Sequence, residues 1–253
     1  MSITLNKVSL PGESDEYFVH LINFLLTPSE CNDLISRYES ELNPSLASHS
    51  KRLRHMFDSQ ELATKLWERL SQFYDGHRVT DSEGYTWVAR RINTRFRFCK
   101  YRHDDAFAPH VDGCLLLSEN EQSFLTVNIY LNTVAEDHGG STRVLKERDA
   151  SDGGPKYEMV AKVQPTIGMA SIFRDSLLHD GEAVKDTQKY LLRTDVVFER
   201  EVKFNFWNLY RDLSDVEKGK KAWDIAQRLE DGGNRDAAIL WYKKAMKFDP
   251  NLD

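Results

Sequence analysis

Residues 93–113, NTRFRFCKYRHDDAFAPHVDG, decide how this chain is expected to fold. The first part of this stretch, residues 94–101, is short and rich in aromatic residues, which predicts a β-strand. Asp104-Asp105 then predicts a turn. A second short segment follows the turn and carries His110 and Asp112. The stretch therefore predicts two strands joined by a turn, with chemically active side chains at the end of the second strand.

Similar short segments recur on both sides of this stretch. They are rich in Val, Ile, Thr, Phe and Tyr, and turn residues separate them. The expected strands are 86–92, 94–101, 123–131, 157–163, 168–174 and 189–198. Many short strands separated by turns are typical of an antiparallel sandwich or barrel. We therefore predict a mainly β core over residues 85–200 within an α+β chain.

Two amphipathic helices are expected before this core. Thr27 and Glu30 form a capping-box pattern with Pro28 at the first helical position, which predicts a helix starting near Thr27. Asp58 and Glu61 repeat the capping pattern and predict a second helix starting near Asp58. Both helices are expected to pack on the sheet and support it.

The last part of the chain is expected to form a helical hairpin. Residues 217–230 and 235–247 are predicted helices, and Gly232-Gly233-Asn234 connects them. Small and aromatic residues in this region resemble one tetratricopeptide repeat. We predict a domain over residues 1–205 and a hairpin over residues 206–253. The hairpin either docks on the main domain or binds a protein partner.

His110 and Asp112 stand two residues apart, so on a strand or its end both side chains can reach one point. His179 follows an apolar strand, Met169 to Phe173, and a short turn. Two imidazoles and one carboxylate form the triad that holds non-haem Fe(II) in oxygenases. These three residues are therefore the predicted metal ligands and catalytic residues. A zinc hydrolase also uses His and carboxylate ligands and is a rival interpretation.

Composition narrows the class of protein. The 253 residues carry a formal net charge of -6, which does not indicate a general affinity for nucleic acid or for anionic membranes. Three widely spaced cysteines argue against a disulfide framework and favour a reducing compartment. The first residues do not resemble a secretory signal, and no apolar stretch has the length of a membrane span. The expected location is the cytosol or nucleus.

Five segments together resemble the catalytic domain of prolyl 4-hydroxylases and related 2-oxoglutarate/Fe(II) oxygenases, in their order and spacing. They are NTRFRFCKYRHDDAFAPHVDG, SFLTVNIYLN, HGGSTRVL, VQPTIGMASIF and LLHDGEAVKDTQKYLLRTDVVF. The resemblance runs from about Arg91 to Glu199. It implies a double-stranded β-helix, or jelly roll, with the iron between two sheets.

The resemblance also implies residues that bind 2-oxoglutarate. Relatives place a basic residue about ten positions after the second metal-binding His, where this chain has Lys189. Arg193 lies on the same side of a strand as Lys189, so either residue could hold the far carboxylate. Tyr101 matches a tyrosine that faces the cosubstrate in relatives, and Tyr130 is a second candidate. For both tyrosines, core packing is the alternative role.

Two departures from the relatives count against a collagen-type peptide substrate. Asp104-Asp105 stands where relatives often have a glycine turn, and Arg193-Thr194-Asp195 stands where many have a tryptophan. Asn93, Arg95 and Arg97 alternate along one strand, so they either touch substrate at the mouth of the barrel or form a solvated face.

The activity that the resemblance implies is hydroxylation of an unactivated C–H bond. It would use Fe(II), 2-oxoglutarate and O2, release succinate and CO2, and take ascorbate as a helper that restores the iron. The substrate would be a protein, a peptide or a small molecule. Two alternatives stay open. The same site could act as a demethylase or small-molecule hydroxylase, or a catalytically silent jelly roll could bind a partner through the C-terminal hairpin.

Overall fold

The computed structural model describes residues 2–45, 50–148 and 154–252. The chain divides into two compact units. Unit 1 comprises residues 1–73, 91–113 and 125–196, and unit 2 comprises residues 74–90, 114–124 and 197–253. Each unit is described separately below.

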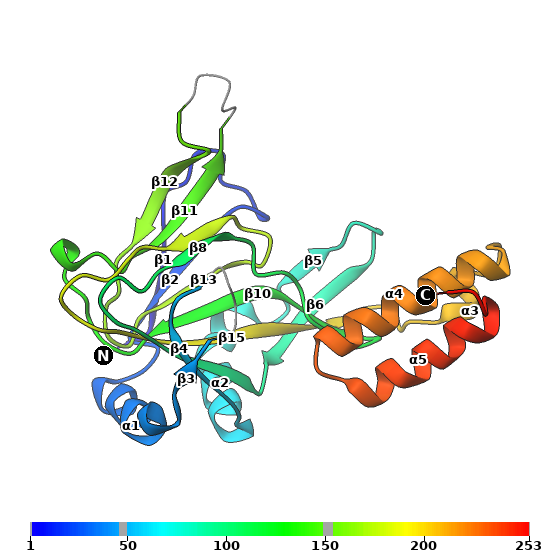
Figure 1. The fold of residues 1–253 in the computed structure, drawn as a ribbon, viewed down its shortest axis with the longest axis horizontal. Helices are drawn as coiled ribbons and strands as arrows, with labels where there is room; N and C mark the ends of the chain where they lie inside the picture. Colours follow the sequence, from blue (N-terminus) through cyan, green and yellow to red (C-terminus); the bar gives the residue numbers. More distant parts are fainter. Residues whose placement is uncertain (1, 46–49, 149–153, 253) are drawn as a thin grey trace. The chain divides into compact units, whose positions relative to one another are not determined.

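The main sheet of unit 1 has the strand order β1-β2-β13-β10-β15-β7-β4-β3 (Figure 1). The pairs whose registers are defined are antiparallel. Its strands are β1 Thr4–Lys7, β2 Val19–Asn23, β3 Asn43–Pro44, β4 Leu53–Asp58, β7 Arg95–Tyr101, β10 Glu121–Tyr130, β13 Ala170–Arg174 and β15 Lys189–Arg200.

A second antiparallel sheet faces the first, with the order β12-β11-β14-β8. Its strands are β8 Phe107–His110, β11 Thr142–Glu147, β12 Tyr157–Val163 and β14 His179–Gly181. The largest part of the apolar core of unit 1 lies between the two sheets. It combines residues such as Phe173 and Leu191 of the main sheet with Val144 and Val163 of the second.

Side chains alternate along β7 and β15, and this alternation decides what reaches the interior. On β7, Phe96 and Phe98 are fully buried on one face. A ring stack from Tyr38 through Phe57 to Phe96 covers that face. The opposite face of β7 carries Arg97, Cys99 and Tyr101. In the register of the two strands these residues lie opposite Arg193, Leu191 and Lys189 of β15.

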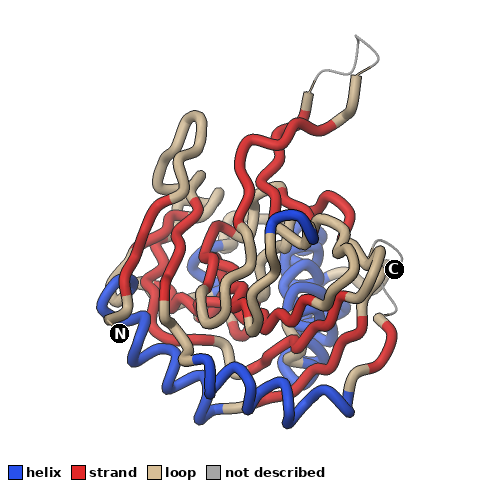
Figure 2. The backbone as a smooth tube through the Cα atoms, turned by 90° about the vertical axis from the view of Figure 1, so that its left-hand side faces the viewer, coloured by secondary structure: helices blue, strands red, loops and turns tan. Residues whose placement is uncertain are grey.

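Two helices lie along the outer face of the main sheet, as the ribbon view (Figure 1) and the tube view (Figure 2) both show. They are α1 Pro28–Tyr38 and α2 Gln60–Tyr74. Thr27 and Glu30 form the predicted capping box. Arg69 of α2 forms a bidentate ion pair with Glu30, at 2.8 and 2.7 Å.

The second helix starts near Asp58 as predicted, but Asp58 does not cap it. Asp58 ends strand β4 and pairs with Arg95 of β7. The side chain of Ser59 instead accepts a hydrogen bond from the backbone N–H of Leu62, at 3.2 Å. Both Asp and Ser can cap a helix. Asp58 does not do so here because the pairing of β4 with β7 places it in the sheet.

Unit 2 is built around a pair of helices, α4 Asp215–Asp231 and α5 Arg235–Phe248. Ser214 and Glu217 form a capping box on α4, and Asn234 caps α5. The helices share an apolar cluster with Leu116 and Phe206, centred on Ala226, Leu229 and Ala245. The remaining elements of this unit are β5 Arg78–Thr80, β6 Thr86–Ile92, β9 Leu116–Ser118 and α3 Phe206–Leu209, of which β6 ends within unit 1.

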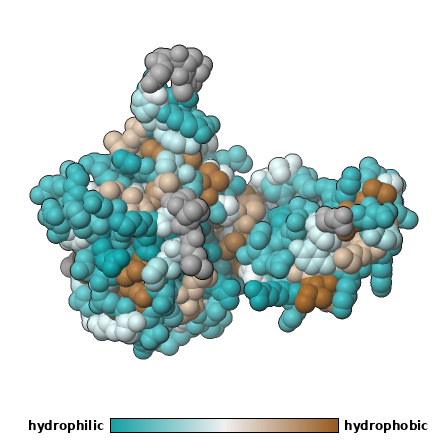
Figure 3. Space-filling model, viewed as in Figure 1, coloured by the Kyte–Doolittle hydropathy of each residue, from teal (hydrophilic) through white to brown (hydrophobic). Residues whose placement is uncertain are grey.

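The predicted fold class is confirmed. The chain is mainly β within an α+β fold, with antiparallel sheets typical of a double-stranded β-helix, helices before them and a helix pair at the end. The boundary at residue 205 stays a prediction. No helix among the described residues is both long and apolar enough to cross a membrane. The face seen in Figure 3 is mostly hydrophilic, with small separate hydrophobic patches.

Candidate metal centre

The pairing of β8 with β14 brings the two predicted histidine ligands together. His110 ends β8 and His179 begins β14, and the two are direct partners across the strand pair. Their ring centroids lie 4.3 Å apart. Residues far apart in the chain therefore meet because the sheet register places them opposite each other.

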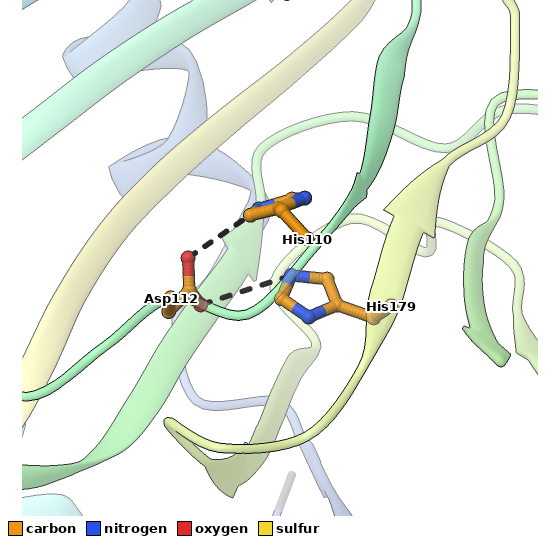
Figure 4. Close-up of side chains that lie close together, drawn as sticks. All are labelled: His110, Asp112 and His179. Carbon is orange, nitrogen blue, oxygen red and sulfur yellow. Dashed lines mark ion pairs between the residues drawn. The ribbon is translucent and has the colours of Figure 1, made fainter. Parts of the chain in front are cut away.

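Asp112 completes the cluster from the loop after β8 (Figure 4). Its Oδ1 lies 3.5 Å from Nε2 of His110, and its Oδ2 lies 3.7 Å from Nε2 of His179. The three potential ligand atoms all lie within 4.8 Å of one another. Two N–H groups, those of Asp112 and Gly113, donate to the carbonyl of Asp175 and fix the loop.

Both imidazoles are oriented by their second nitrogen. Nδ1 of His110 lies 2.8 Å from the carbonyl oxygen of Ala108, and Nδ1 of His179 lies 2.9 Å from that of Leu177. A carbonyl oxygen only accepts, so each Nδ1 carries the proton and each Nε2 presents its lone pair to the cluster. Such partners fix the tautomer of metal-binding histidines. Burial lowers the pKa of His179 against the opposing charge of Asp112, which favours the neutral form that binds a metal.

Asp112 is held as a carboxylate. Thr126 donates a hydrogen bond to its Oδ2 at 2.7 Å, and Arg193 lies 3.0 Å from its Oδ1. Burial opposes ionisation, but the Arg193 guanidinium and the hydrogen bond from Thr126 outweigh it and hold the pKa of Asp112 well below its usual range. The residues present therefore fit a divalent metal with nitrogen and oxygen ligands.

Lys189 is a buried cation in the same cavity. Its side chain is enclosed, with the residue only 3% exposed. The ammonium donates to the carbonyl of Gly140 at 2.7 Å, and it lies 5.3 Å from the ring centroid of Tyr101. Burial lowers the pKa of Lys189 to about 8. A buried ammonium beside neutral groups is suited to receiving an anionic ligand.

The other predicted contacts differ in their surroundings. Arg193 lines the cavity but is engaged by Asp112 and, at 3.4 Å, by Asp195. Tyr101 lines the cavity beside Lys189. Tyr130 is fully buried, and its hydroxyl bonds Thr142 at 2.9 Å and Ser171 at 3.0 Å. The environment of Lys189 thus fits a far-carboxylate anchor better than that of Arg193, and Tyr101 fits a cosubstrate contact better than Tyr130.

Sequence reasoning missed several residues of this cavity. Its lining comprises the metal cluster together with Arg52, Arg97, Cys99, Tyr101, Phe107, Asn128, Thr142, Asp180, Gly181, Lys189, Leu191 and Arg193. Thr126 and Asn128 follow the alternation that leads to Tyr130 on β10, so the strand period could have indicated them. Arg52 precedes β4 and carries no such signal. Among the described residues, Oδ1 of Asn128 and Nε of Arg52 and of Arg193 are buried without a hydrogen-bond partner, as expected where a ligand completes a site.

The first departure from the relatives has a structural explanation. Asp104 has a φ of 63°, the left-handed conformation that glycine adopts most readily and that Asp tolerates better than most residues. Its backbone N–H donates to the carbonyl of Val184 at 2.8 Å. The turn is therefore kept without the glycine.

One known protein family matches the part of the chain that carries the metal cluster. Residues 96–194 match the model of the 2OG-Fe(II) oxygenase superfamily. No curated protein sequence matches the chain. Among solved structures, the chain is similar to the collagen prolyl hydroxylase of Paramecium bursaria Chlorella virus-1 in complex with 2OG, at 20% identity and a TM-score of 0.49, covering 73% of this chain and 97% of that one. It is also similar to a Pseudomonas putida prolyl-4-hydroxylase, at 15% identity and a TM-score of 0.49, covering 74% and 94%.

Proposed function

We propose that this chain is a 2OG-Fe(II) oxygenase that hydroxylates an unactivated C–H bond of its substrate, because residues 96–194 match the model of that superfamily. Fe(II) and 2-oxoglutarate are the metal and cosubstrate that the family and the His-Asp-His cluster imply. The observation that carries the proposal is the convergence of His110, Asp112 and His179 beside a buried lysine in one cavity.

The bound metal and cosubstrate supply the oxidative chemistry, in which 2-oxoglutarate and O2 yield succinate, CO2 and one oxygen atom for the substrate. The protein's own residues hold and orient the reactants. His110 and His179 present Nε2 because their Nδ1–H groups are anchored to backbone carbonyls. Thr126 and Arg193 fix the carboxylate of Asp112.

Lys189 is the proposed partner of the far carboxylate of 2-oxoglutarate. An ion pair in this enclosed position would offset the cost of burying the ammonium, which the carbonyl of Gly140 meets only in part. Tyr101, which lies directly opposite Lys189 across the strand pair, is the proposed second contact. Arg193 is then left to hold Asp112.

A catalytically silent scaffold is the alternative from another class. It would have no use for Asp112, whose side chain is 3% exposed and lies close to two imidazoles. Burying a carboxylate costs free energy unless partners compensate it. The arrangement therefore favours a metal site, while partner binding by the C-terminal hairpin stays a prediction.

Anaerobic titration with Fe(II) and then 2-oxoglutarate tests the proposed function. We expect a visible charge-transfer band that needs both additions, followed by succinate once air is admitted. His179→Ala should abolish the band, whereas His103→Ala should keep it, because the side chain of His103 is 60% exposed and does not line the cavity. A folded wild-type protein without the band would overturn the oxygenase and leave the scaffold.

A further inference from the structure

The cavity around the metal cluster holds more cations than the proposed cofactors use. Four cationic side chains line it among the described residues, namely Arg52, Arg97, Lys189 and Arg193. The carboxylates in its lining are Asp112 and Asp180, and Asp180 is bound by Arg143 at 2.8 and 2.6 Å. Fe(II) adds two positive charges and 2-oxoglutarate two negative ones, so loading the site leaves this excess unchanged.

Two of these cations face each other across a strand pair. Arg97 of β7 and Arg193 of β15 are direct cross-strand partners. Like charges directly opposite each other destabilise a sheet. Asp195 compensates only partly, because its carboxylate is shared between Arg97, at 3.5 Å, and Arg193, at 3.4 Å. Arg193 also serves Asp112, so Arg97 is the guanidinium with capacity for a further anion.

Arg52 reaches the cavity from another element. Its guanidinium carbon lies 4.1 Å from the centroid of the Phe107 ring, and that ring stacks on His110 at 3.8 Å. Arg52 therefore stands one aromatic ring away from the metal cluster. It donates to the hydroxyl of Ser50, while its Nε is buried without a hydrogen-bond partner among the described residues. No carboxylate of the described residues forms an ion pair with it.

We propose that the primary substrate carries an oxyanion, a carboxylate or phosphate group, which Arg52 and Arg97 bind while its reacting carbon faces the metal. This inference rests on the proposed function and specifies its substrate class. Guanidinium groups present forked N–H donors that match the oxygens of either group. Arg193-Thr194-Asp195, which stands where many relatives have a tryptophan, is part of this proposed binding site, because Asp195 pairs with Arg97 and positions it.

Calorimetric titration of the full chain under nitrogen tests the proposal. The protein is first loaded with Fe(II) and saturating 2-oxoglutarate, and the charge-transfer band verifies loading. Three probes of similar outline are then compared: benzoate, phenylphosphonate and neutral benzamide. We expect at least one anion to bind about tenfold or more tightly than benzamide, as charge-assisted hydrogen bonds imply. The anion that binds more tightly shows whether the acidic group of the substrate is a carboxylate or a phosphate.

Matched variants assign the effect to residues. Arg52→Gln and Arg97→Gln should each weaken anion binding about tenfold and leave 2-oxoglutarate binding intact. Arg54→Gln and Arg95→Gln, two residues away and outside the cavity lining, should change neither. The Arg97 side chain is only 16% exposed, so its replacement can disturb folding. If Arg97→Gln does not fold, Arg52→Gln alone decides.

Equal affinity for the three probes, or anion binding that survives Arg52→Gln, would overturn the substrate class while the oxygenase stands. A wild-type protein that fails to load Fe(II) and 2-oxoglutarate would overturn both proposals, and this is seen before any probe is added.

Discussion

Replacement of Lys189 by Met should stabilise the ligand-free protein while removing its cosubstrate site. Burial lowers the pKa of Lys189 from 10.5 to about 8, which corresponds to about 3 kcal/mol of destabilisation at pH 7. Met fills a similar volume without the charge. The substitution also removes the hydrogen bond from the lysine to the carbonyl of Gly140, which costs roughly 1–2 kcal/mol. The expected net gain is therefore about 1–2 kcal/mol.

This gain should depend on pH. Between pH 8 and 10.5 the unfolded chain keeps the lysine proton that the folded chain has released, so the stability of the wild type rises with pH in this window. The net advantage of Lys189→Met should be complete below pH 8 and vanish about one pH unit above it. It should become a deficit of about 1–2 kcal/mol towards pH 10.5, where only the lost hydrogen bond still counts. Urea denaturation of both proteins at pH 7 and pH 10 measures this difference.

The same variant should bind 2-oxoglutarate at least about 30-fold more weakly, because it leaves a buried carboxylate without its partner. Lys100→Met is the matched control, since Lys100 is on the other face of β7 and pairs with Glu39 at 2.6 Å. It should leave 2-oxoglutarate binding unchanged. Unchanged binding in Lys189→Met would refute the reasoning and assign the far carboxylate to Arg193. A loss of stability at pH 7 would show that the buried ammonium does not destabilise the ligand-free fold.

Substitutions at three further positions test the geometry of the site and the backbone. Thr126→Val removes the 2.7 Å hydrogen bond to Asp112 and should weaken Fe(II) binding about tenfold in competition with a chromogenic chelator; unchanged affinity would mean that Arg193 alone orients the carboxylate. Asp104→Val should cost about 1–2 kcal/mol because φ is 63°, whereas Asp104→Gly should be nearly neutral; equal denaturation curves would contradict this. Gly168→Ala would place Cβ 2.1 Å from the carbonyl oxygen of Leu26 at a φ of 76°, so it should lose more than about 2 kcal/mol. A smaller loss in thermal denaturation would show that the contact relaxes.

Much of the fold could be predicted from the sequence, because local patterns indicate helix ends and strands. The capping box at Thr27 and Glu30 predicted the start of α1, since the residues that satisfy a helix end are adjacent in sequence. The short aromatic-rich segment 94–101 predicted β7 for the same reason. Asp58 was assigned to a helix cap because its role depends on Arg95, a strand partner that no local pattern reveals.

For the candidate site, too, the sequence predicted what depends on local spacing, and the structure decided the rest. His110 and Asp112 are two residues apart, so the strand period alone indicates that they converge. Lys189 and Arg193 share one strand face, and sequence left the choice between them open. The structure distinguishes their surroundings, because Arg193 meets Asp112 whereas Lys189 meets Tyr101.

The sequence by itself determined the helices at both ends of the chain, six of the strands, the family resemblance and the candidate ligands, because each depends on short-range patterns or on motifs with fixed spacing. It did not indicate strands such as β1, β2 and β11, whose places depend on pairing with distant strands. Only the tertiary structure decided which cations share the cavity. Arg52 arrives from outside the core strands, and Arg97 faces Arg193 through the register of β7 and β15. Strand register and ring stacking join residues that are distant along the chain, so the charge of the site emerges only when the sheets are assembled.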